Sequence, residues 1–96
     1  MVIAKVVGSA VATLKHELLK TDKLLLVRPA DPEGNVSGQP FLAIDLVGVG
    51  EGELVIVSQG SSARMAAGHN ASPADAAIVG ILDSLRVEGA TVFRKE

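Results

Sequence analysis

Short apolar runs separated by turn residues dominate the hydropathy pattern, and they predict a chain that is mainly β. Residues 2–13 (VIAKVVGSAVAT) are rich in Val and Ile and lack helical periodicity, which predicts a long strand that bends or bulges at Gly8. The other runs with the length of short strands are residues 24–27 (LLLV), 41–47 (FLAIDLV), 54–58 (LVIVS) and 90–94 (ATVFR).

The segments between these runs predict loops and short helices. Residues 30–40 (ADPEGNVSGQP) contain no apolar pattern and predict a long exposed loop with a turn at residues 32–35. Residues 15–20 (KHELLK) fit one helical turn or a connection. Residues 61–68 (SSARMAAG) favour a short helix because Ala and Met are good helix formers.

The clearest helix signal begins at Ser72, which is a good N-cap residue and is followed by Pro73 at the first helical position. Asp75 favours the positive end of a helix dipole. Apolar residues fall on one face at helical spacing: Ala74, Ile78, Ile81, Leu82 and Leu85. Residues 77–82 also fit a short buried strand, but the capping signals favour the helix. Five strands and one principal helix predict a small closed β-barrel that forms a single domain over residues 1–96.

The amino-acid composition indicates that the protein forms an oligomer. The chain has 96 residues, of which 48% are hydrophobic, but it has two aromatic residues and no cysteine. Its mean hydropathy is +0.39. A small domain cannot hide this much apolar surface internally, so part of it is expected between subunits. No apolar run reaches the roughly 20 residues of a membrane span and no secretory signal is apparent, which predicts a soluble intracellular protein.

Two glycine clusters, residues 48–52 (GVGEG) and 60–62 (GSS), bracket the apolar run at residues 54–57. Phosphate-binding loops need a following lysine and hydroxyl residue, and dinucleotide fingerprints must open a helix. The first cluster instead precedes a strand, and no lysine follows it. The glycines therefore predict tight structural loops, with no cofactor.

Catalysis, metal binding and nucleic-acid binding are all poorly supported. A nucleophile elbow built on Ser61 or Ser62 fails because position 64 is arginine, and His16 and His69 lie in polar segments. Two distant histidines without cysteine give no zinc spacing. The net charge is −2 and there is neither Trp nor Tyr, so a basic face with stacking aromatics is missing.

Asp45 stands within an apolar strand, where a carboxylate is costly unless it is paired or hydrogen-bonded. Arg64 is one plausible partner, within the chain or across a subunit boundary. The alternative is that Asp45 points outward from a half-exposed strand.

The order of several motifs resembles the EutN/CcmL family, over nearly the whole chain. These motifs are Val6-Val7-Gly8, Ala12-Thr13, Lys23-Leu24-Leu25, Ala43-Ile44-Asp45, Gly48-Val49-Gly50-Glu51-Gly52-Glu53, Gly60-Ser61-Ser62-Ala63-Arg64 and residues 75–83 (DAAIVGILD). The loop at residues 31–38 and the tail at residues 92–95 resemble the ethanolamine-utilisation type. Val49 departs from the pattern because alanine is common there.

The resemblance implies an OB-like five-stranded barrel that assembles into a homopentameric ring. Such pentamers cap the vertices of polyhedral bacterial microcompartments in the bacterial cytoplasm, next to hexameric and related shell tiles. The family implies a structural role and no catalysis. The alternative is a small OB-type module that binds a nucleotide or oligonucleotide.

Within such a ring, we expect the second glycine cluster to lie near the five-fold axis and the first to contact the adjacent subunit. The candidate pore-rim residues are Gly60, Ser61 and Ser62. The candidate subunit-interface residues are Gly48, Gly50, Gly52, Glu53, Arg64 and Asp45, with Arg64 pairing to Glu53 or Asp45 across the boundary.

Overall fold

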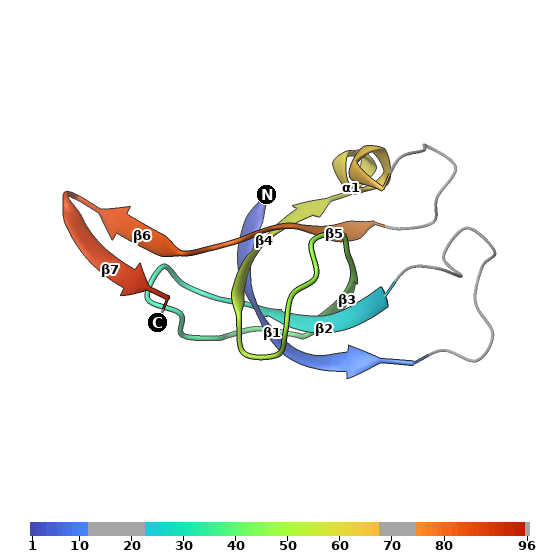
Figure 1. Ribbon diagram of the computed structural model, residues 1–96, viewed down its shortest axis with the longest axis horizontal. Helices are drawn as coiled ribbons and strands as arrows, with labels where there is room; N and C mark the ends of the chain where they lie inside the picture. The colour runs from blue at the N-terminus through green and yellow to red at the C-terminus, as the bar shows by residue number, and fades with distance from the viewer. Residues whose placement is uncertain (12–22, 68–74, 96) are drawn as a thin grey trace.

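The computed structural model describes residues 1–11, 23–67 and 75–95 of the chain, and Figure 1 shows the arrangement of its elements. In chain order these are β1 (Val2–Ala10), β2 (Lys23–Pro29), β3 (Phe41–Asp45), β4 (Leu54–Gln59), α1 (Ser61–Ala66), β5 (Ala76–Ile81), β6 (Ser84–Val87) and β7 (Ala90–Arg94). Five strands close a barrel in the order β1-β2-β3-β5-β4, and β6 and β7 form a separate two-stranded sheet. The predicted small five-stranded barrel is therefore confirmed.

The barrel closes because its long first strand serves two neighbours. Residues 2–5 of β1 pair antiparallel with β4, and residues 4–10 pair antiparallel with β2. The register between β1 and β2 shifts between Val6 and Gly8, so the predicted irregularity at Gly8 is a β-bulge. The pairing of β3 with β5 is the parallel one among these strands.

Alternate residues of each strand point inward and fill the barrel, which is the expected pattern for a small closed sheet. The core cluster consists of Ala4, Val6, Leu25, Val27, Ala43, Val49, Val55, Val57, Ala76 and Ile78, all at most 5% exposed. Burial of these small branched side chains supplies the main driving force for folding.

The helix predicted after Ser72, with an apolar face that reached Leu85, is wrong, because residues 76–81 form β5 and residues 84–87 form β6. Strand β5 is hydrogen-bonded to β3 on one side and β4 on the other. Ile78 faces the barrel core, while Ala77 packs outward against Ala63 of α1. Burial on both faces makes the run continuously apolar, so its spacing does not distinguish strand from helix. The weighed alternative, a strand at residues 77–82, describes the structure better.

The described helix, α1, fits the short helix expected at residues 61–68. Residues 90–94 do form a strand, but β7 pairs with β6 and does not contribute the fifth strand of the barrel. The expectations for residues 15–20, and for Ser72 and Pro73, lie outside the described residues.

The β6–β7 hairpin projects from one end of the barrel and lengthens the molecule to 44 × 23 × 23 Å (Figure 1). Its turn contains Glu88 and Gly89, both with positive φ, at 51° and 83°. The loop after β2 lies beside the hairpin, since a Cβ added at Gly34 would stand 3.9 Å from Cδ1 of Phe93. Within the described parts of the chain, no helix is long and apolar enough to cross a membrane.

The predicted turn at residues 32–35 is present in this loop. The Gly34 N–H donates to the Asp31 carbonyl at 2.9 Å, and the Asp31 carboxylate accepts the N–H groups of Glu33 and Asn35, each at 2.9 Å. These bonds, that from the Asn35 backbone above all, lower the pKa of Asp31.

Candidate subunit-contact site

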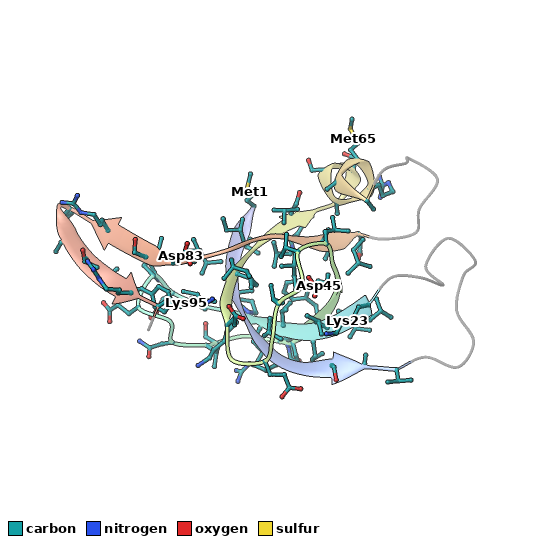
Figure 2. All side chains as sticks on the ribbon, in the orientation of Figure 1. Met1, Lys23, Asp45, Met65, Asp83 and Lys95 are labelled. Carbon is teal, nitrogen blue, oxygen red and sulfur yellow. The ribbon has the colours of Figure 1, made fainter. Side chains whose placement is uncertain are left out.

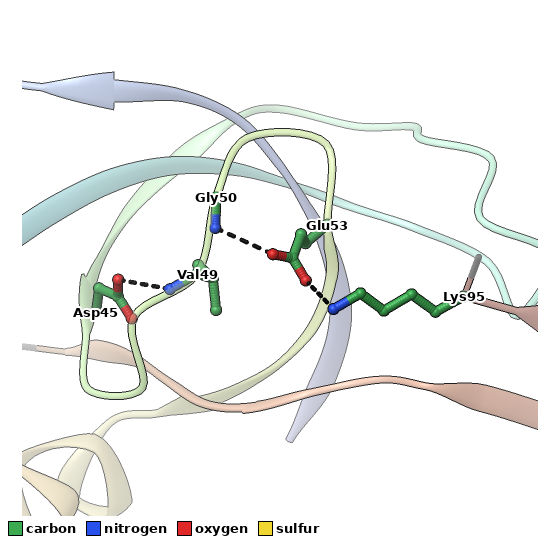
Figure 3. A network of polar contacts seen from close by, with 5 residues as sticks. All are labelled: Asp45, Val49, Gly50, Glu53 and Lys95. Atoms are coloured by element: carbon green, nitrogen blue, oxygen red, sulfur yellow. Dashed lines mark hydrogen bonds and ion pairs between the residues drawn. The ribbon is translucent and has the colours of Figure 1, made fainter.

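Asp45, at the end of β3, anchors the first glycine cluster. Its Oδ1 accepts the N–H groups of Val47 at 3.0 Å and Gly48 at 2.9 Å. Its Oδ2 accepts the N–H of Val49 at 3.0 Å, which Figure 3 shows. Three donors satisfy a carboxylate that would otherwise be costly in an apolar strand. Asp45 is therefore hydrogen-bonded, and its partners among the described residues are backbone N–H groups of the loop and not the Arg64 side chain.

The loop from residue 46 to residue 53 crosses one end of the barrel, because it joins β3 to β4 while β5 lies between those strands. Val49 is 3% exposed and belongs to the core, so the loop inserts this side chain into the barrel end. Gly48 and Gly52 have φ angles of 81° and 88°, which other residues rarely adopt. The Val49 side chain thus closes this end of the barrel.

Backbone bonds attach the far side of this loop to β1. The Gly52 N–H donates to the Val6 carbonyl at 2.8 Å, and the Val6 N–H donates to the Glu53 carbonyl at 3.0 Å. The loop is consequently fixed at both ends, as the tight structural loop predicted from the glycines requires.

Glu53 connects the loop to the carboxyl end of the chain. Its Oε1 accepts the Gly50 N–H at 3.3 Å, and its Oε2 lies 2.8 Å from Nζ of Lys95 (Figure 3). Oε2 is shielded from solvent, and the Lys95 ammonium compensates its charge. The ammonium, and next the Gly50 N–H, lower the pKa of Glu53, while the Glu53 carboxylate raises the pKa of Lys95.

A pocket of about 580 Å³ lies between this loop and the base of the hairpin. Its lining combines the carboxylates of Glu51 and Glu53 with the cations of Lys5, Arg94 and Lys95. Charges of both signs line it, so the pocket has no strong preference for an anion or a cation. Among the described residues, no group of three or more His, Cys, Asp or Glu side chains is placed to hold a metal ion.

The second glycine cluster starts α1. Gly60 has a φ of 64°, donates its N–H to the Asp75 carbonyl at 2.7 Å and accepts the N–H of Ala63 at 3.1 Å through its own carbonyl. Ser61 and Ser62 are exposed in the first turn, and neither side chain caps the helix. The start of α1 is therefore a surface of small, exposed residues.

Packing fixes α1 on the outside of the barrel. Ala63 is fully buried in one apolar cluster with Ala77 of β5 and Ile44 of β3, the residue before Asp45. Arg64 lies in the last turn of α1 and is half-buried, while Met65, which is 69% exposed, points away from the barrel (Figure 2). Within residues 1–11, 23–67 and 75–95, no ion pair joins Arg64 to a carboxylate.

The structure therefore gathers the predicted interface residues Gly48, Gly50, Gly52 and Glu53 in one loop, which is bonded to Asp45 at the end of β3. The predicted rim residues and Arg64 lie at α1. Sequence reasoning missed Lys95, whose pairing with Glu53 spans a long stretch of chain. It also missed the structural role of Val49, although an apolar residue among glycines is a signal for burial.

Comparison with known proteins relates this arrangement to one family. Residues 1–83 match the family described as ethanolamine utilisation protein EutN/carboxysome. The chain is 44% identical over 95 residues to the bacterial microcompartment shell vertex protein EutN of Escherichia coli (strain K12), covering 99% of this chain and 100% of the relative. It is 42% identical over 97 residues to the carboxysome shell vertex protein CcmL of Nostoc sp. (strain PCC 7120), covering 100% and 96%.

Solved structures agree with these relatives. An ethanolamine utilization protein, EutN, superposes with a TM-score of 0.92 at 44% identity, covering 100% of both chains. The GrpN pentameric microcompartment shell protein from Rhodospirillum rubrum superposes with a TM-score of 0.83 at 42% identity, covering 91% of this chain and 99% of that one.

Proposed function

The chain belongs to the EutN/CcmL family of microcompartment and carboxysome shell vertex proteins, and on that premise we propose that five copies form a ring that caps a vertex of a polyhedral shell. The protein is a structural shell component and not an enzyme. The observation that carries the proposal is the match to EutN over the full length of both chains, with a TM-score of 0.92.

The start of α1 is suited to the rim of the ring. Gly60, Ser61 and Ser62 are exposed, and a Cβ added at Gly60 would meet no atom within 4 Å. Small side chains allow five identical backbones to converge around an axis without collision. The hydroxyl groups would then line the opening.

The loop from Gly48 to Glu53 is suited to contact the neighbouring copy. The bonds of Asp45 and Glu53 hold this loop in one conformation before assembly, which reduces the entropy lost on association. Arg64 has no carboxylate partner among the described residues of its own chain. It would pair with Asp45 or Glu53 of the next copy, whose carboxylates retain free acceptor sites.

Further partners follow from the same assignment. The outer rim of the ring would contact hexameric shell tiles, and the assembly would lie in the shell of a microcompartment in the bacterial cytoplasm. The second candidate, an OB-type module for a nucleotide or oligonucleotide, is not favoured, because the net charge is −2 and stacking Tyr and Trp side chains are absent.

Native mass spectrometry of the purified chain tests the ring directly, and five subunits are expected. A monomer at micromolar concentration, or a ring with a different number of subunits, would contradict the proposal.

The variant Ser62→Trp tests the rim, because five indole rings near one axis would collide. A lower pentamer yield is expected for Ser62→Trp, and an unchanged yield is expected for Val87→Trp, which changes an exposed residue of the hairpin, away from α1. Equal yields from the two variants would contradict the rim assignment.

A further inference from the structure

Strands β2 and β3 are apolar on both faces. Leu25, Val27 and Ala43 point into the barrel, while Leu24, Leu26 and Leu42 point outward. A barrel strand that faced water would alternate apolar with polar residues. The outward side of this wall is therefore built to be covered.

Three residues define what we call patch A, on this wall: Val7, Leu26 and Leu42. Leu26 pairs across the sheet with Gly8 on one side and with Leu42 on the other. Val7 is the extra residue of the bulge at this position. Exposure is 40% for Val7 and 47% for Leu42, so much of the patch is open to solvent.

A second outward apolar pair, Ile3 and Ile56, defines patch B. Ile3 of β1 pairs across the sheet with Ile56 of β4, which in turn pairs with Gly80 of β5. A Cβ added at Gly80 would stand 3.3 Å from Cδ1 of Ile56, so the isoleucine lies flat over the glycine. The flanking outward residues of β4, Leu54 and Ser58, are buried, whereas Ile3 and Ile56 are half-buried, so patch B is the part of this face that a neighbour can still cover.

The two patches lie on opposite walls of the barrel. Patch A centres on the β2–β3 pair, and patch B centres on β4, which is separated from that pair by β1 on one side and β5 on the other. Two different patches on opposite walls cannot both be buried by a two-fold dimer, which joins a surface to itself. A head-to-tail contact buries both, and its repetition closes a ring when the rotation allows.

We propose that patch A of one copy packs on patch B of the next around the ring. This inference rests on the proposed function, which supplies a second copy as the occupant of each surface. The excess apolar content of a small domain supports it, since the mean hydropathy is +0.39. The similar shell protein GrpN, 42% identical, is pentameric, and an odd number of subunits agrees with a head-to-tail contact.

Cysteine crosslinking tests the pairing, because the chain contains no cysteine. The variants are Leu42→Cys in patch A, Ile3→Cys in patch B and the double variant carrying both, each treated with a short bismaleimide crosslinker. The double variant is expected to give covalent ladders up to the full ring on denaturing gels. Each single variant is expected to remain monomeric on the gel. The variant pair Met65→Cys and Ile3→Cys is a control that should not form ladders.

Charge substitution provides a second measurement. Leu42→Asp and Ile3→Asp are each expected to convert the ring to folded monomers, and an equal mixture of the two retains one intact A–B pairing and is expected to form heterodimers. Met65→Asp should leave the ring intact. Circular dichroism tests whether each variant is folded. If an aspartate variant does not fold, the lysine variant at the same position, Leu42→Lys or Ile3→Lys, is used instead.

The outcomes separate this inference from the proposed function. Covalent dimers from Leu42→Cys alone would show that patch A meets itself, and would overturn the head-to-tail pairing. Five-subunit rings in the wild type and also in both aspartate variants would overturn the pairing of patch A with patch B. That result would leave the proposed function unchanged. A wild-type chain without a five-subunit mass would contradict the proposed function itself.

Discussion

The barrel and the β6–β7 hairpin are stabilised in different ways. The barrel closes five strands around a core of residues at most 5% exposed, whereas no residue of β6 or β7 is buried. Two-stranded hairpins are marginal by themselves in water. The hairpin is held instead by the Lys95–Glu53 ion pair, by the Lys95 N–H bonded to the Asp83 carbonyl at 2.7 Å, and by Phe93 beside Gly34. The stability of the fold thus resides in the barrel, and a few polar contacts set the position of the hairpin.

A cavity in the barrel core should have the largest effect on stability, and it should destabilise the barrel and the hairpin together. Ile78→Ala removes a side chain that is 0% exposed, at an expected cost of about 2–5 kcal/mol in the free energy of unfolding. Urea denaturation measures this loss, and amide hydrogen exchange should show the hairpin and the barrel losing protection together. The control Val87→Ala, at a hairpin position that is 43% exposed, should change the free energy by about 0.5 kcal/mol or less.

Removal of the Asp45 carboxylate should have the next largest effect. Asp45→Ala leaves three backbone donors of the loop without their acceptor, at an expected cost of about 1–2 kcal/mol. Asp45→Asn retains one acceptor oxygen and should lose less. Equal stability of wild type and Asp45→Ala in urea denaturation would mean that the loop does not depend on these bonds.

Two glycines of the same loop provide a matched comparison. Gly52→Ala forces a Cβ onto a residue with a φ of 88°, at an expected cost of about 1 kcal/mol. Gly50→Ala should cost less, because Gly50 does not have a positive φ and a Cβ there meets only Oε1 of Glu53, at 3.7 Å. A thermal midpoint for Gly50→Ala below that of Gly52→Ala would contradict the assignment of backbone strain.

The smallest effect is expected from the ion pair, and it should be confined to the hairpin. Lys95→Met should raise amide exchange in residues 84–94 and leave the thermal midpoint of the barrel nearly unchanged, because the barrel core does not contact this side chain. Arg94→Met is the matched control, since Arg94 is exposed and lies next to Lys95. Similar exchange in the two variants would show that the pair does not hold the hairpin.

The pH dependence of this contact follows from the two pKa shifts. The pKa of Glu53 is lowered from 4.5, so its contribution is present above 4.5 and is lost as the pH falls through the lowered value. The pKa of Lys95 is raised from 10.5, so its contribution is complete below 10.5 and is lost as the pH rises through the raised value. The difference in hairpin protection between wild type and Lys95→Met, corrected for intrinsic exchange rates, should therefore be constant between these limits and vanish in acid.

Most of the barrel could be predicted from local sequence pattern, because short β-branched runs between turn residues have few alternatives. The exception, β5, was mistaken for a helix because Ala76, Ala77 and Ile78 are all buried. Its partners β3 and β4 and the covering helix α1 were needed to decide between the two periods. Tertiary context here outweighs the local capping signals that precede the strand.

The local geometry of the candidate site could be predicted in part from the sequence. Glycine clusters identified both loops, since positive φ angles leave a trace in sequence. The role of Asp45 as a backbone acceptor also has a local signal, because an Asp before a tight turn commonly accepts nearby N–H groups. The pairing of Glu53 with Lys95 has no such signal, because it depends on where the hairpin folds back. The apolar residues of β2 and β3 are visible in the sequence as LLLV and FLAIDL. Which of them point into the barrel and which point outward can be decided only from the pairing of the strands.

The parallel pairing of β3 with β5 has a consequence for how the protein is made. β1, β2 and β3 are consecutive antiparallel strands and can assemble as soon as they leave the ribosome, but the barrel cannot close until residues 76–81 have been synthesised. Non-local parallel pairing of this kind forms slowly. During that interval, β2 and β3 expose leucines on both faces of an open sheet, which is the state most prone to aggregation. We expect slow translation between β3 and β5 to lower the yield of soluble protein, and chaperones that shield apolar sheets to restore it.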